Sequence, residues 1–577
     1  MTPEITARNF AHYWCAVMVQ GLIDRKVDHF FVAPGSRSTP FVSALARNSQ
    51  AKISLGIDER SVCYAALGFA KCAQRPSAVV VTSGTAVANL YPAVVESYLS
   101  EVPLLLITAD RPYELRNSGA NQTIWQANMF SNHVNQSFDL APPSSIVSLN
   151  QSLAIFDQAV RYCVGARKGP VHVNLQFREP VANVPHEGEA DWSDTAIKPS
   201  RVTTDLGLGF SHCAVDGLLD FLSSDRGLIV VGELMPTSVQ DDILTLSSLT
   251  NWPIFTDITS NLRLCRHPNL LHYGELAFLH REFFTLLDVD RVLKFGARVV
   301  SKRFWSWVEA SPRAQWLSLS ESPERIDHVG HFSHVQVSSL KSVLTSINER
   351  CQEKGPSARI NALTRFQNKI AHLVDQFLAV KQNNEAYFVT RVMAHIMEPA
   401  TLFLSSGMPI RDMDQVARPS GVAVNVLANR GVSGIDGVIS SAAGVAIADE
   451  KPVILLIGDV AFLHDTNGLM LLAITKAPVL IIVINNNGGG IFHFLPIAAE
   501  QDVVTPYLDT PHDVQIRALC QAHHVAHALV RDPEEYDDAL RQFFTERKTM
   551  VVEVVIDRAV NVQLHKDFYR QIANLTV

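Results

Sequence analysis

Residues 457–492 of the chain read IGDVAFLHDTNGLMLLAITKAPVLIIVINNNGGGIF. Two short apolar runs flank a helical stretch, and each run ends in glycine or polar residues, which is the pattern of two parallel strands joined by a helix. Asp459 follows the first run, and Asn486 and Gly488 follow the second. Because the carboxyl ends of neighbouring parallel strands meet at one edge of a sheet, we expect these three residues to lie close together.

The residue types at these strand ends favour a metal–diphosphate site. A carboxylate, an amide oxygen and a backbone carbonyl are hard oxygen ligands suited to Mg²⁺ (or Mn²⁺) that keeps water or phosphate oxygens in its other positions. Glycines 488–490 would let the backbone approach a diphosphate closely. The alternative is an ordinary strand-to-loop junction, since Gly-Asp alone is common. The Asn-Asn pair at the end of the next strand favours the metal site over that alternative.

Similar strand and helix patterns extend over most of the chain and predict an α/β protein, in which central parallel sheets are flanked by helices. Two polar segments, His186–Ser200 and Cys351–Arg359, are interpreted as linkers. They divide the chain into a first domain of residues 1–185, a central domain of 201–350 and a third domain of 361–577.

The first and third domains are predicted to be copies of one plan. Gly68–Pro76 and Gly444–Pro452 both span eight residues, while Gly84–Pro103 and Gly458–Pro478 span 19 and 20. A repeated helix–strand–turn–helix–strand unit explains both spacings, and the alternative is two ordinary units with chance spacing. The glycines are expected to allow tight turns beyond the strand ends.

Composition narrows the class of protein. A chain of 577 residues has room for about three or four domains, and 47% hydrophobic with 18% charged residues indicates a globular protein with large cores. The net charge of −8 argues against nucleic acid as a partner. No apolar run is long enough to span a membrane, and the N-terminus lacks a signal-peptide core. Eight scattered cysteines without a CxxC pair fit a reducing cytoplasm.

Several further segments carry a specific resemblance. They are FVAPGSRSTP (31–40), IDERS (57–61), TSGTAVANLYPAVVE (82–96), TADRPYELRNSGANQTIWQ (108–126), GPVHVNLQFREP (169–180), GARVVSKR (296–303), NRGVSGIDG (429–437) and NNNGGGIF (485–492). With them, most of the chain resembles the thiamin-diphosphate enzymes. Among these it resembles the 2-succinyl-5-enolpyruvyl-6-hydroxy-3-cyclohexene-1-carboxylate (SEPHCHC) synthase family of menaquinone biosynthesis.

The resemblance implies a thiamin-diphosphate-binding fold of three domains. The first holds the aminopyrimidine, the third holds the diphosphate, and the central domain is structural with a contribution to the substrate site. Glu59 is implied as the catalytic glutamate on the aminopyrimidine ring, although the local sequence alone favours a solvated glutamate at a helix start. Ile435 is implied to prop the cofactor, and its alternative is ordinary core. The implied cofactor-binding residues are Glu59, Gly84, Ile435, Asp459, Asn486, Gly488, Gly489, Ile491 and Phe492, with Asp459, Asn486 and Gly488 on the metal.

The implied substrate site is rich in cations, which suit carboxylates because arginine offers two parallel hydrogen bonds. Its residues are Ser36, Arg37, Arg111, Asn121, Gln122, Lys302, Arg303, Arg411 and Arg430. One stretch departs from the family pattern: in SSGMPIR (405–411), Ser406 and Gly407 stand where the family has Asn and Ser. The hydroxyl expected at 407 is therefore missing.

The resemblance implies a transferase that decarboxylates 2-oxoglutarate and adds the succinyl-semialdehyde-like carbanion to isochorismate, giving SEPHCHC and CO₂. It also implies a homodimer, with pairing into a dimer of dimers left open. A 2-oxo-acid decarboxylase or acetolactate synthase is the rival within enzymes, and the cationic residues argue against its small neutral acceptors. A catalytically silent cofactor-binding homologue is the other rival, and retention of Glu59, Asp459 and Asn486 argues against it.

Overall fold

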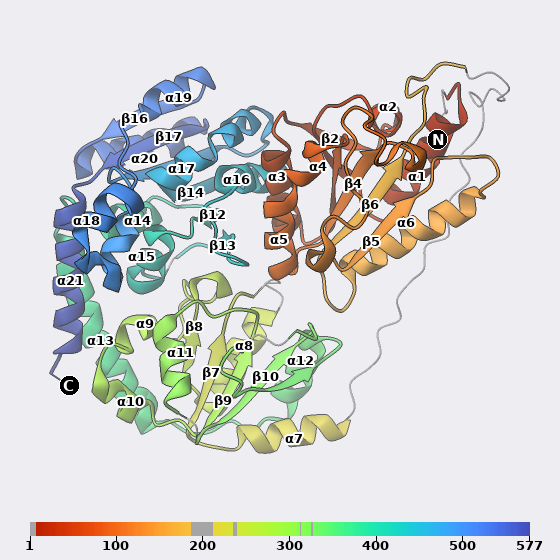
Figure 1. Ribbon diagram of the computed structural model, residues 1–577. Coiled ribbons are helices and arrows are strands. Elements are labelled where there is room, and N and C mark those ends of the chain that lie inside the picture. The colour runs from red at the N-terminus through yellow and green to blue at the C-terminus, as the bar shows by residue number, and fades with distance from the viewer. Residues whose placement is uncertain are drawn as a thin grey trace. The chain divides into compact units, whose positions relative to one another are not determined.

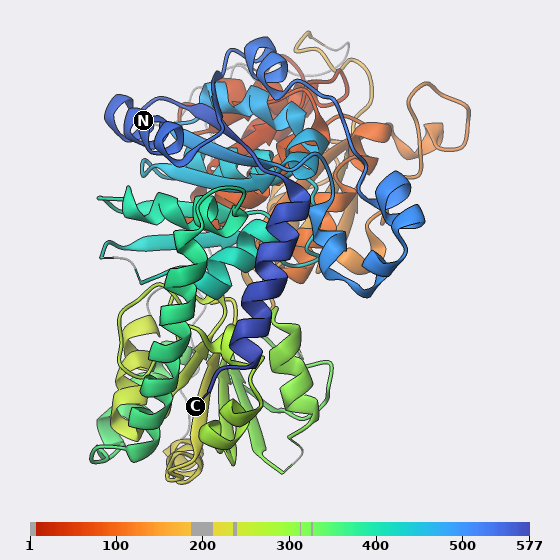
Figure 2. The same ribbon diagram turned by 90° about the vertical axis from the view of Figure 1, so that its left-hand side faces the viewer.

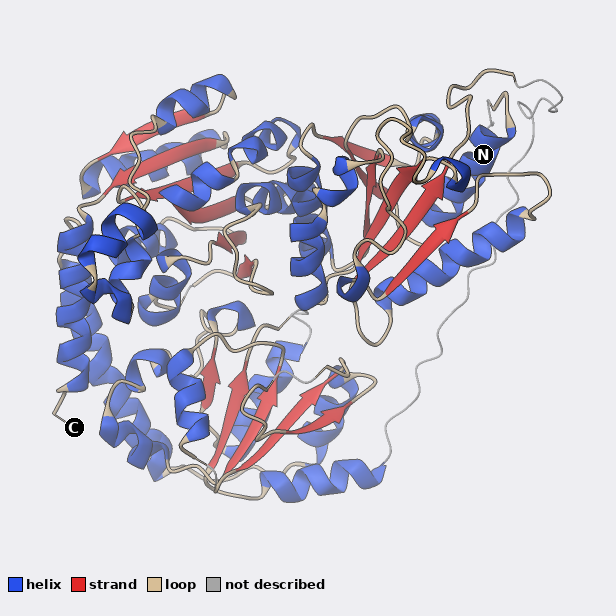
Figure 3. Ribbon diagram, in the orientation of Figure 1, coloured by secondary structure: helices blue, strands red, loops and turns tan. Residues whose placement is uncertain are grey.

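Three sheets of parallel strands, each flanked by helices, organise the chain (Figure 1, Figure 3). The structure is a computed structural model that describes residues 7–185, 212–234, 239–311, 313–324, 327–419 and 421–576. The predicted α/β class with three parallel sheets is confirmed. The predicted linker His186–Ser200 lies outside the described residues. In the second predicted linker, residues 351–357 lack regular secondary structure, whereas Arg359 already belongs to a helix.

The first sheet has the strand order β2-β1-β3-β4-β6-β5. Helices α1 and α6 pack together over one face, and α3 and α5 cover the other (Figure 1). The strands are β1 (His29–Val32), β2 (Lys52–Leu55), β3 (Ser77–Val81), β4 (Leu104–Asp110), β5 (Gln136–Leu140) and β6 (Pro170–Gln176). The helices are α1 (Phe10–Asp24), α2 (Thr39–Arg47), α3 (Glu59–Ala73), α4 (Thr85–Ala88), α5 (Tyr91–Leu99) and α6 (Leu149–Val164).

The second sheet has the order β11-β10-β9-β7-β8. Its strands are β7 (Gly227–Val231), β8 (Ile254–Thr256), β9 (Arg291–Phe295), β10 (Gln315–Ser320) and β11 (Ser333–Gln336). The helices along this stretch are α7 (His212–Leu222), α8 (Gln240–Thr250), α9 (Gly274–Ala277), α10 (Arg281–Leu287), α11 (Lys302–Glu309) and α12 (Leu340–Arg350).

The third sheet has the order β13-β12-β14-β15-β17-β16, the same pattern as the first sheet. Its strands are β12 (Ala400–Leu404), β13 (Val424–Ala428), β14 (Val453–Gly458), β15 (Val479–Asn485), β16 (Ala526–Val530) and β17 (Met550–Val555). The helices of this part of the chain are α13 (Ala358–Ala379), α14 (Glu385–Arg391), α15 (Met408–Val416), α16 (Val438–Ala448), α17 (Asp459–His464), α18 (Gln501–Val503), α19 (Ile516–Ala522), α20 (Pro533–Glu546) and α21 (Arg558–Ala573). The identical strand order supports the predicted duplication.

The described residues form two compact units. The first contains the described parts of residues 1–206, 429–450 and 464–477, and therefore the first sheet together with α16. The second contains those of 207–428, 451–463 and 478–577, and therefore the other two sheets. Within the second unit, the long helices α13 and α21 run side by side, with the Phe377 and Phe568 rings stacked 4.3 Å apart (Figure 2).

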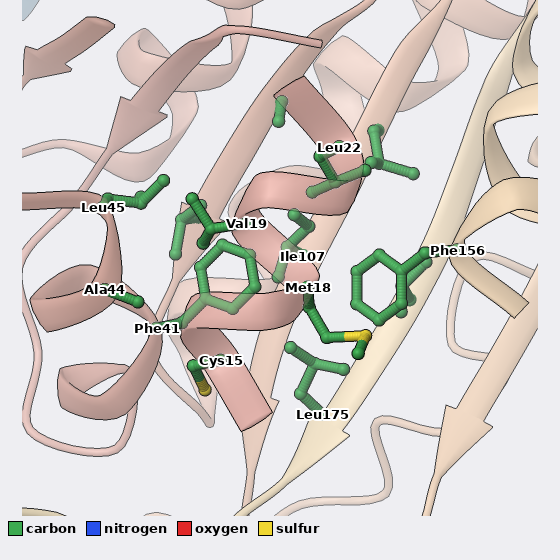
Figure 4. Packing of buried hydrophobic residues seen from close by; sticks show 14 of the residues in the cluster. Cys15, Met18, Val19, Leu22, Phe41, Ala44, Leu45, Ile107, Phe156 and Leu175 are labelled. Atoms are coloured by element: carbon green, nitrogen blue, oxygen red, sulfur yellow. The ribbon is translucent and has the colours of Figure 1, made fainter. Parts of the chain in front are cut away.

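The core of the first sheet follows from its sequence. Every residue of β3 and β4 is buried, as expected for parallel strands covered on both faces. In Figure 4, Met18 of α1, Phe156 of α6 and Leu175 of β6 lie together, and none is more than 1% exposed. In the described part of the chain, no helix is both long and apolar enough to cross a membrane.

Two equivalent glycines lie where helices α3 and α16 cross. A Cβ on Gly68 would lie 2.0 Å from the carbonyl oxygen of Ser441, and one on Gly444 would lie 1.9 Å from that of Ala65. Both glycines lie inside helices, ahead of strands β3 and β14, and permit close backbone approach. Gly84 does turn the chain, with φ of +82°. The residue type was informative, but glycine serves both purposes.

Gly444→Ala is expected to lower the free energy of unfolding by about 1–3 kcal/mol, since the two helices must separate to admit the methyl group. Gly217→Ala is the matched control, because Gly217 is an exposed glycine of α7 with nothing within 4 Å of an added Cβ. That change is expected to stabilise by up to about 1 kcal/mol. Chemical denaturation measures both, and equal unfolding free energies for the two variants would contradict the crossing.

Candidate functional site

The metal–diphosphate motif lies at the carboxyl edge of the third sheet. Strands β14 and β15 pair in parallel, with Gly458 opposite Ile484. Asp459 begins α17 directly after β14, and its Oδ2 accepts a hydrogen bond from the Gly488 N–H at 2.8 Å. The predicted proximity of these strand ends is therefore confirmed.

The oxygen atoms around this edge fit a hard cation. The Asp459 side chain is buried, and burial raises the pKa of its carboxyl although N–H groups of Gly488 and Val460 oppose the shift. The Oδ1 atom of Asn486 is buried and has no hydrogen-bond partner among the described residues. A carboxylate, an amide oxygen and a backbone carbonyl such as that of Gly488 are the donor types that Mg²⁺ favours.

The loop after β15 depends on glycine. Gly488 has φ of +132°, and a Cβ there would lie 2.2 Å from the Asp509 carbonyl oxygen. A Cβ on Gly490 would lie 2.7 Å from the Asn486 side-chain nitrogen. Ile491 and Phe492 follow in a short 3₁₀ helix and are half-buried. A side chain at 490 would therefore displace Asn486, and one at 488 would displace the backbone of Asp509.

In the first unit, the predicted residues gather at the carboxyl edge of the first sheet. Glu59 follows β2 as the first residue of α3, while Arg37 and Arg111 follow β1 and β4. Glu59 is half-buried, and its Oε2 accepts a hydrogen bond from Asn89 Nδ2 at 3.3 Å. A helix start favours a negative charge at this position.

Gly84 and Arg111 both lie next to Gln122. The Gln122 Nε2 donates to the Ser83 carbonyl at 2.8 Å, and a Cβ on Gly84 would lie 2.8 Å from Gln122 Cγ. Arg111 donates to the Ser83 hydroxyl and, at 3.0 Å, to the Gln122 carbonyl. Asn121 precedes Gln122, and both are exposed.

Arg37 and Arg111 carry the same charge at this edge but have different partners. Burial lowers the pKa of Arg111, and the neighbouring Arg37 guanidinium adds to the effect. Arg37 follows the exposed Ser36, and its Nη2 pairs with Glu179 at 2.8 Å. Because the Glu179 side chain is 67% exposed, this pair is weak and open to exchange for a substrate carboxylate.

Arg430 and Ile435 belong to a loop that Glu96 of α5 holds within the first unit. Glu96 accepts hydrogen bonds from the N–H groups of Gly431 and Val432, both at 2.9 Å. It also pairs with Lys71 of α3 at 3.3 Å, and neither side chain is more than 1% exposed. Arg430 is buried, whereas Ile435 is 36% exposed and is therefore not ordinary core.

The second unit carries the remaining predicted cations. Arg303 Nη1 pairs with Glu275 of α9 at 2.6 Å and lies over the Tyr569 ring, while Lys302 is exposed. Burial raises the pKa of Glu275, and Arg303 opposes that shift. Arg411 donates to the carbonyls of Ser406 (2.7 Å) and Gly407 (2.5 Å), at the start of its own helix α15. The departure at 406–407 is thus in contact with Arg411 through backbone atoms.

Comparison with known proteins identifies the family. Residues 15–136 match "Thiamine pyrophosphate enzyme, N-terminal TPP binding domain", 204–404 match "Middle domain of thiamine pyrophosphate", and 406–554 match "Thiamine pyrophosphate enzyme, C-terminal TPP binding domain". The SEPHCHC synthase of Salinibacter ruber is 36% identical over 97% of this chain and 96% of its own length. The SEPHCHC synthase of Rubrobacter xylanophilus is 35% identical over 96% of this chain and 97% of its own length.

The chain belongs to the SEPHCHC synthase family. It is a thiamin-diphosphate-dependent enzyme of the transferase class. The solved structure of benzoylformate decarboxylase from Polynucleobacter necessarius covers 94% of this chain and 98% of its own, with a TM-score of 0.71. At 16% identity this likeness shows the shared fold alone.

The structure thus groups the predicted residues by unit. The first unit brings together Ser36, Arg37, Glu59, Gly84, Arg111, Asn121 and Gln122 along one sheet edge, and it also holds Arg430 and Ile435. The second holds Asp459, Asn486 and the glycine loop at one sheet edge, and Lys302, Arg303 and Arg411 on α11 and α15.

The acidic partners of these residues were not predicted from the sequence. Glu96, Glu179 and Glu275 each bind a predicted cation or the loop that carries one. Glu96 lies inside the segment TSGTAVANLYPAVVE, which carries part of the family resemblance, but no role was predicted for this residue. His512, whose Nε2 lies 3.3 Å from Asp459 Oδ2, had no signal in the spacing of motifs.

Glu96→Ala is expected to destabilise the fold by about 3–5 kcal/mol, because it leaves the Lys71 ammonium buried without its ion partner. The matched control is Glu114→Ala, which breaks a 2.6 Å pair with Arg178 whose side chains are 40% and 50% exposed. That loss is expected to be at most about 1 kcal/mol. Urea denaturation compares them, and a small loss for Glu96→Ala would refute the anchoring role.

Proposed function

We propose that this chain decarboxylates 2-oxoglutarate and transfers the four-carbon product to isochorismate, giving SEPHCHC and CO₂ in menaquinone biosynthesis. The observation that carries the proposal is the similarity to SEPHCHC synthases over nearly the whole chain. Retention of Glu59, Asp459 and Asn486 supports an active enzyme. The seven cysteines with described side chains are free thiols, which supports a place in the cytoplasm.

The third sheet's edge is proposed to hold the metal and the diphosphate. Asp459, Asn486 and the Gly488 carbonyl bind Mg²⁺ or Mn²⁺, and Gly488, Gly489, Ile491 and Phe492 bind the diphosphate. When bound, thiamin diphosphate supplies a thiazolium carbon that stabilises the negative charge left by departing CO₂. The unused Oδ1 of Asn486 supports the assignment, since a buried polar atom ordinarily has a partner.

Glu59 is proposed to hydrogen-bond a ring nitrogen of the aminopyrimidine and to hold a proton at that nitrogen. Its side chain stands at the first turn of α3. The half-buried position keeps part of the carboxylate open to a ligand. Gly84 and Ile435 are proposed to contact the same cofactor, Ile435 through its exposed side chain.

The cations are proposed to hold the substrate carboxylates. Donor and acceptor are both dicarboxylates, so their mutual repulsion and lost hydration must be offset by positive charge. Arg37 and Arg111, with Ser36, Asn121 and Gln122, serve this purpose in the first unit alongside Arg430. Lys302, Arg303 and Arg411 serve it in the second.

With isochorismate, Mg²⁺ and thiamin diphosphate, kcat/KM for 2-oxoglutarate is expected to exceed that for pyruvate by at least about 100-fold, because pyruvate leaves cations unpaired. Arg411→Ala should reduce this ratio of kcat/KM values between the two donors, with little effect on the affinity for thiamin diphosphate. The control is Arg541→Ala, an exposed arginine paired with Asp538. Product analysis and steady-state rates provide the test. Equal values for both donors would overturn the donor, and absence of SEPHCHC would overturn the function.

Asn486→Ala is expected to leave the thermal stability of the apoprotein unchanged, because its Oδ1 accepts no hydrogen bond from any residue that the structure describes. The affinity for thiamin diphosphate in Mg²⁺ should fall by at least about tenfold, since even residues that only support a metal ligand contribute that much. Calorimetry measures the affinity, and EDTA added to the wild type should reproduce the loss. A stability loss with unchanged affinity would argue against a metal ligand.

We further propose a homodimer whose active sites combine Glu59 of one subunit with Asp459 of the other. A dimer of dimers is the second assembly that the family resemblance leaves open. Glu59→Gln and Asp459→Ala are each expected to be inactive alone. After unfolding and refolding together they should regain about a quarter of wild-type activity, because half of the dimers are mixed and each mixed dimer has one intact site. No regain in proven mixed dimers would place each site within one subunit.

A further inference from the structure

A short segment, Asp509–His512, contacts the glycine loop of the metal–diphosphate motif within the second unit. We call this segment the brace. It follows a π-helical turn at Val504–Leu508 and precedes α19. The sequence of the brace, DTPH, carries no recognised motif. Its contacts reach every residue of the loop from Asn487 to Gly489, as well as Asp459.

Asp509 is the centre of these contacts. Its carbonyl oxygen accepts a hydrogen bond from the Gly489 N–H at 2.6 Å. Its carboxylate lies 2.9 and 3.1 Å from Nε2 of His493, in the 3₁₀ helix that continues the loop. The same carboxylate pairs with Arg558 at 3.1 Å, and the Asp509 side chain is fully buried.

Arg558 and His512 complete the enclosure. Arg558, the first residue of α21, also donates from Nη1 to the Asn487 carbonyl at 3.4 Å. The His512 N–H donates to Asn487 Oδ1 at 2.9 Å, and its Nε2 lies 3.3 Å from Asp459 Oδ2. The loop is therefore held on one side by Asp459 and on the other by the brace.

The composition of the loop explains why it needs such support. Three consecutive glycines have the greatest backbone freedom of any residue type and lose the most entropy when fixed. A loop that binds a diphosphate through its backbone must nevertheless present those groups in one arrangement. No side chain at 488–490 can pack to enforce it, because a Cβ on Gly488 would strike the Asp509 carbonyl.

We propose that Asp509 is a positioning residue for the metal–diphosphate loop, acting through Gly489, His493 and Arg558. This role rests on the proposed cofactor site. Asp509 touches neither metal nor cofactor in this proposal; it fixes the residues that do. The buried carboxylate neutralises Arg558 and aligns it with the loop carbonyl, while its own backbone oxygen fixes the Gly489 amide.

The chain offers a closely matched control. Asp537 of α20 is also a carboxylate bound by one arginine and one histidine, Arg391 at 2.8 Å and His395 at 2.9 Å. These partners belong to α14 and the turn after it, and none belongs to the glycine loop. Asp509→Asn and Asp537→Asn thus remove the same kind of interaction from the same unit, one at the loop and one away from it.

The experiment compares the two variants in the full-length protein with two readouts. Hydrogen exchange of the apoprotein is expected to quicken in peptides covering 486–494 for Asp509→Asn and to stay at the wild-type rate there for Asp537→Asn. Calorimetry in Mg²⁺ is expected to show thiamin-diphosphate affinity lowered about 10- to 100-fold for Asp509→Asn. Asp537→Asn should bind within about twofold of the wild type.

Arg558→Gln keeps Asp509 and should reproduce the loss in affinity, and Arg558→Lys should restore part of it. This pair decides the question if Asp509→Asn does not fold. Wild-type exchange and affinity in a folded Asp509→Asn, or in Arg558→Gln, would overturn the positioning role. If exchange quickens but wild-type protein binds no thiamin diphosphate, the proposed cofactor site fails, and the positioning role fails with it.

Discussion

One hydrogen bond joins the two strand ends on which the proposed chemistry depends. The Gly488 N–H donates to Asp459 Oδ2, so the residue after β14 fixes the loop after β15. The bond requires a buried carboxylate, whose desolvation is unfavourable until amide donors or a cation compensate it. It also requires a loop that can come close, which only glycine permits at φ of +132°. The burial of Asp459 and the glycine at 488 are thus both tied to that one contact.

The same logic governs the cations. Each predicted arginine with a described partner is held by an acidic side chain or by backbone carbonyls before any substrate arrives. Such pairing offsets the repulsion between neighbouring arginines, so that several of them can lie near one another in the folded protein. The Glu179 side chain is 67% exposed and that of Glu275 only 11%, so the two ion pairs differ in how open they are to solvent. Arg37 is free to exchange its partner at little cost, whereas Arg303 is fixed in place.

The sequence allowed the fold class and the meeting of the strand ends at Asp459 and Gly488 to be predicted, because both follow from local patterns. Strand ends, glycines and the Asp–Asn coupling are all visible within 36 residues of IGDV…GGIF. The supporting residues were not predictable, because Glu96 and Asp509 act on partners that only folding brings near. The contact at Gly68 and Gly444 was not predictable for a related reason: the sequence shows that a side chain is missing, but not that a neighbouring helix requires the space.

The crossing of α3 and α16 has a consequence for the history of the chain. Gly68 faces Ser441, three residues before Gly444, and Gly444 faces Ala65, three residues before Gly68. The contact is therefore related to itself by a local twofold rotation, as in an isologous interface. A single ancestral half, before duplication and fusion, could make this crossing with a second copy of itself, with one glycine filling both positions. Once the halves diverged, the two glycines became separate positions under a shared constraint, and neither can gain a side chain unless the opposite backbone retreats.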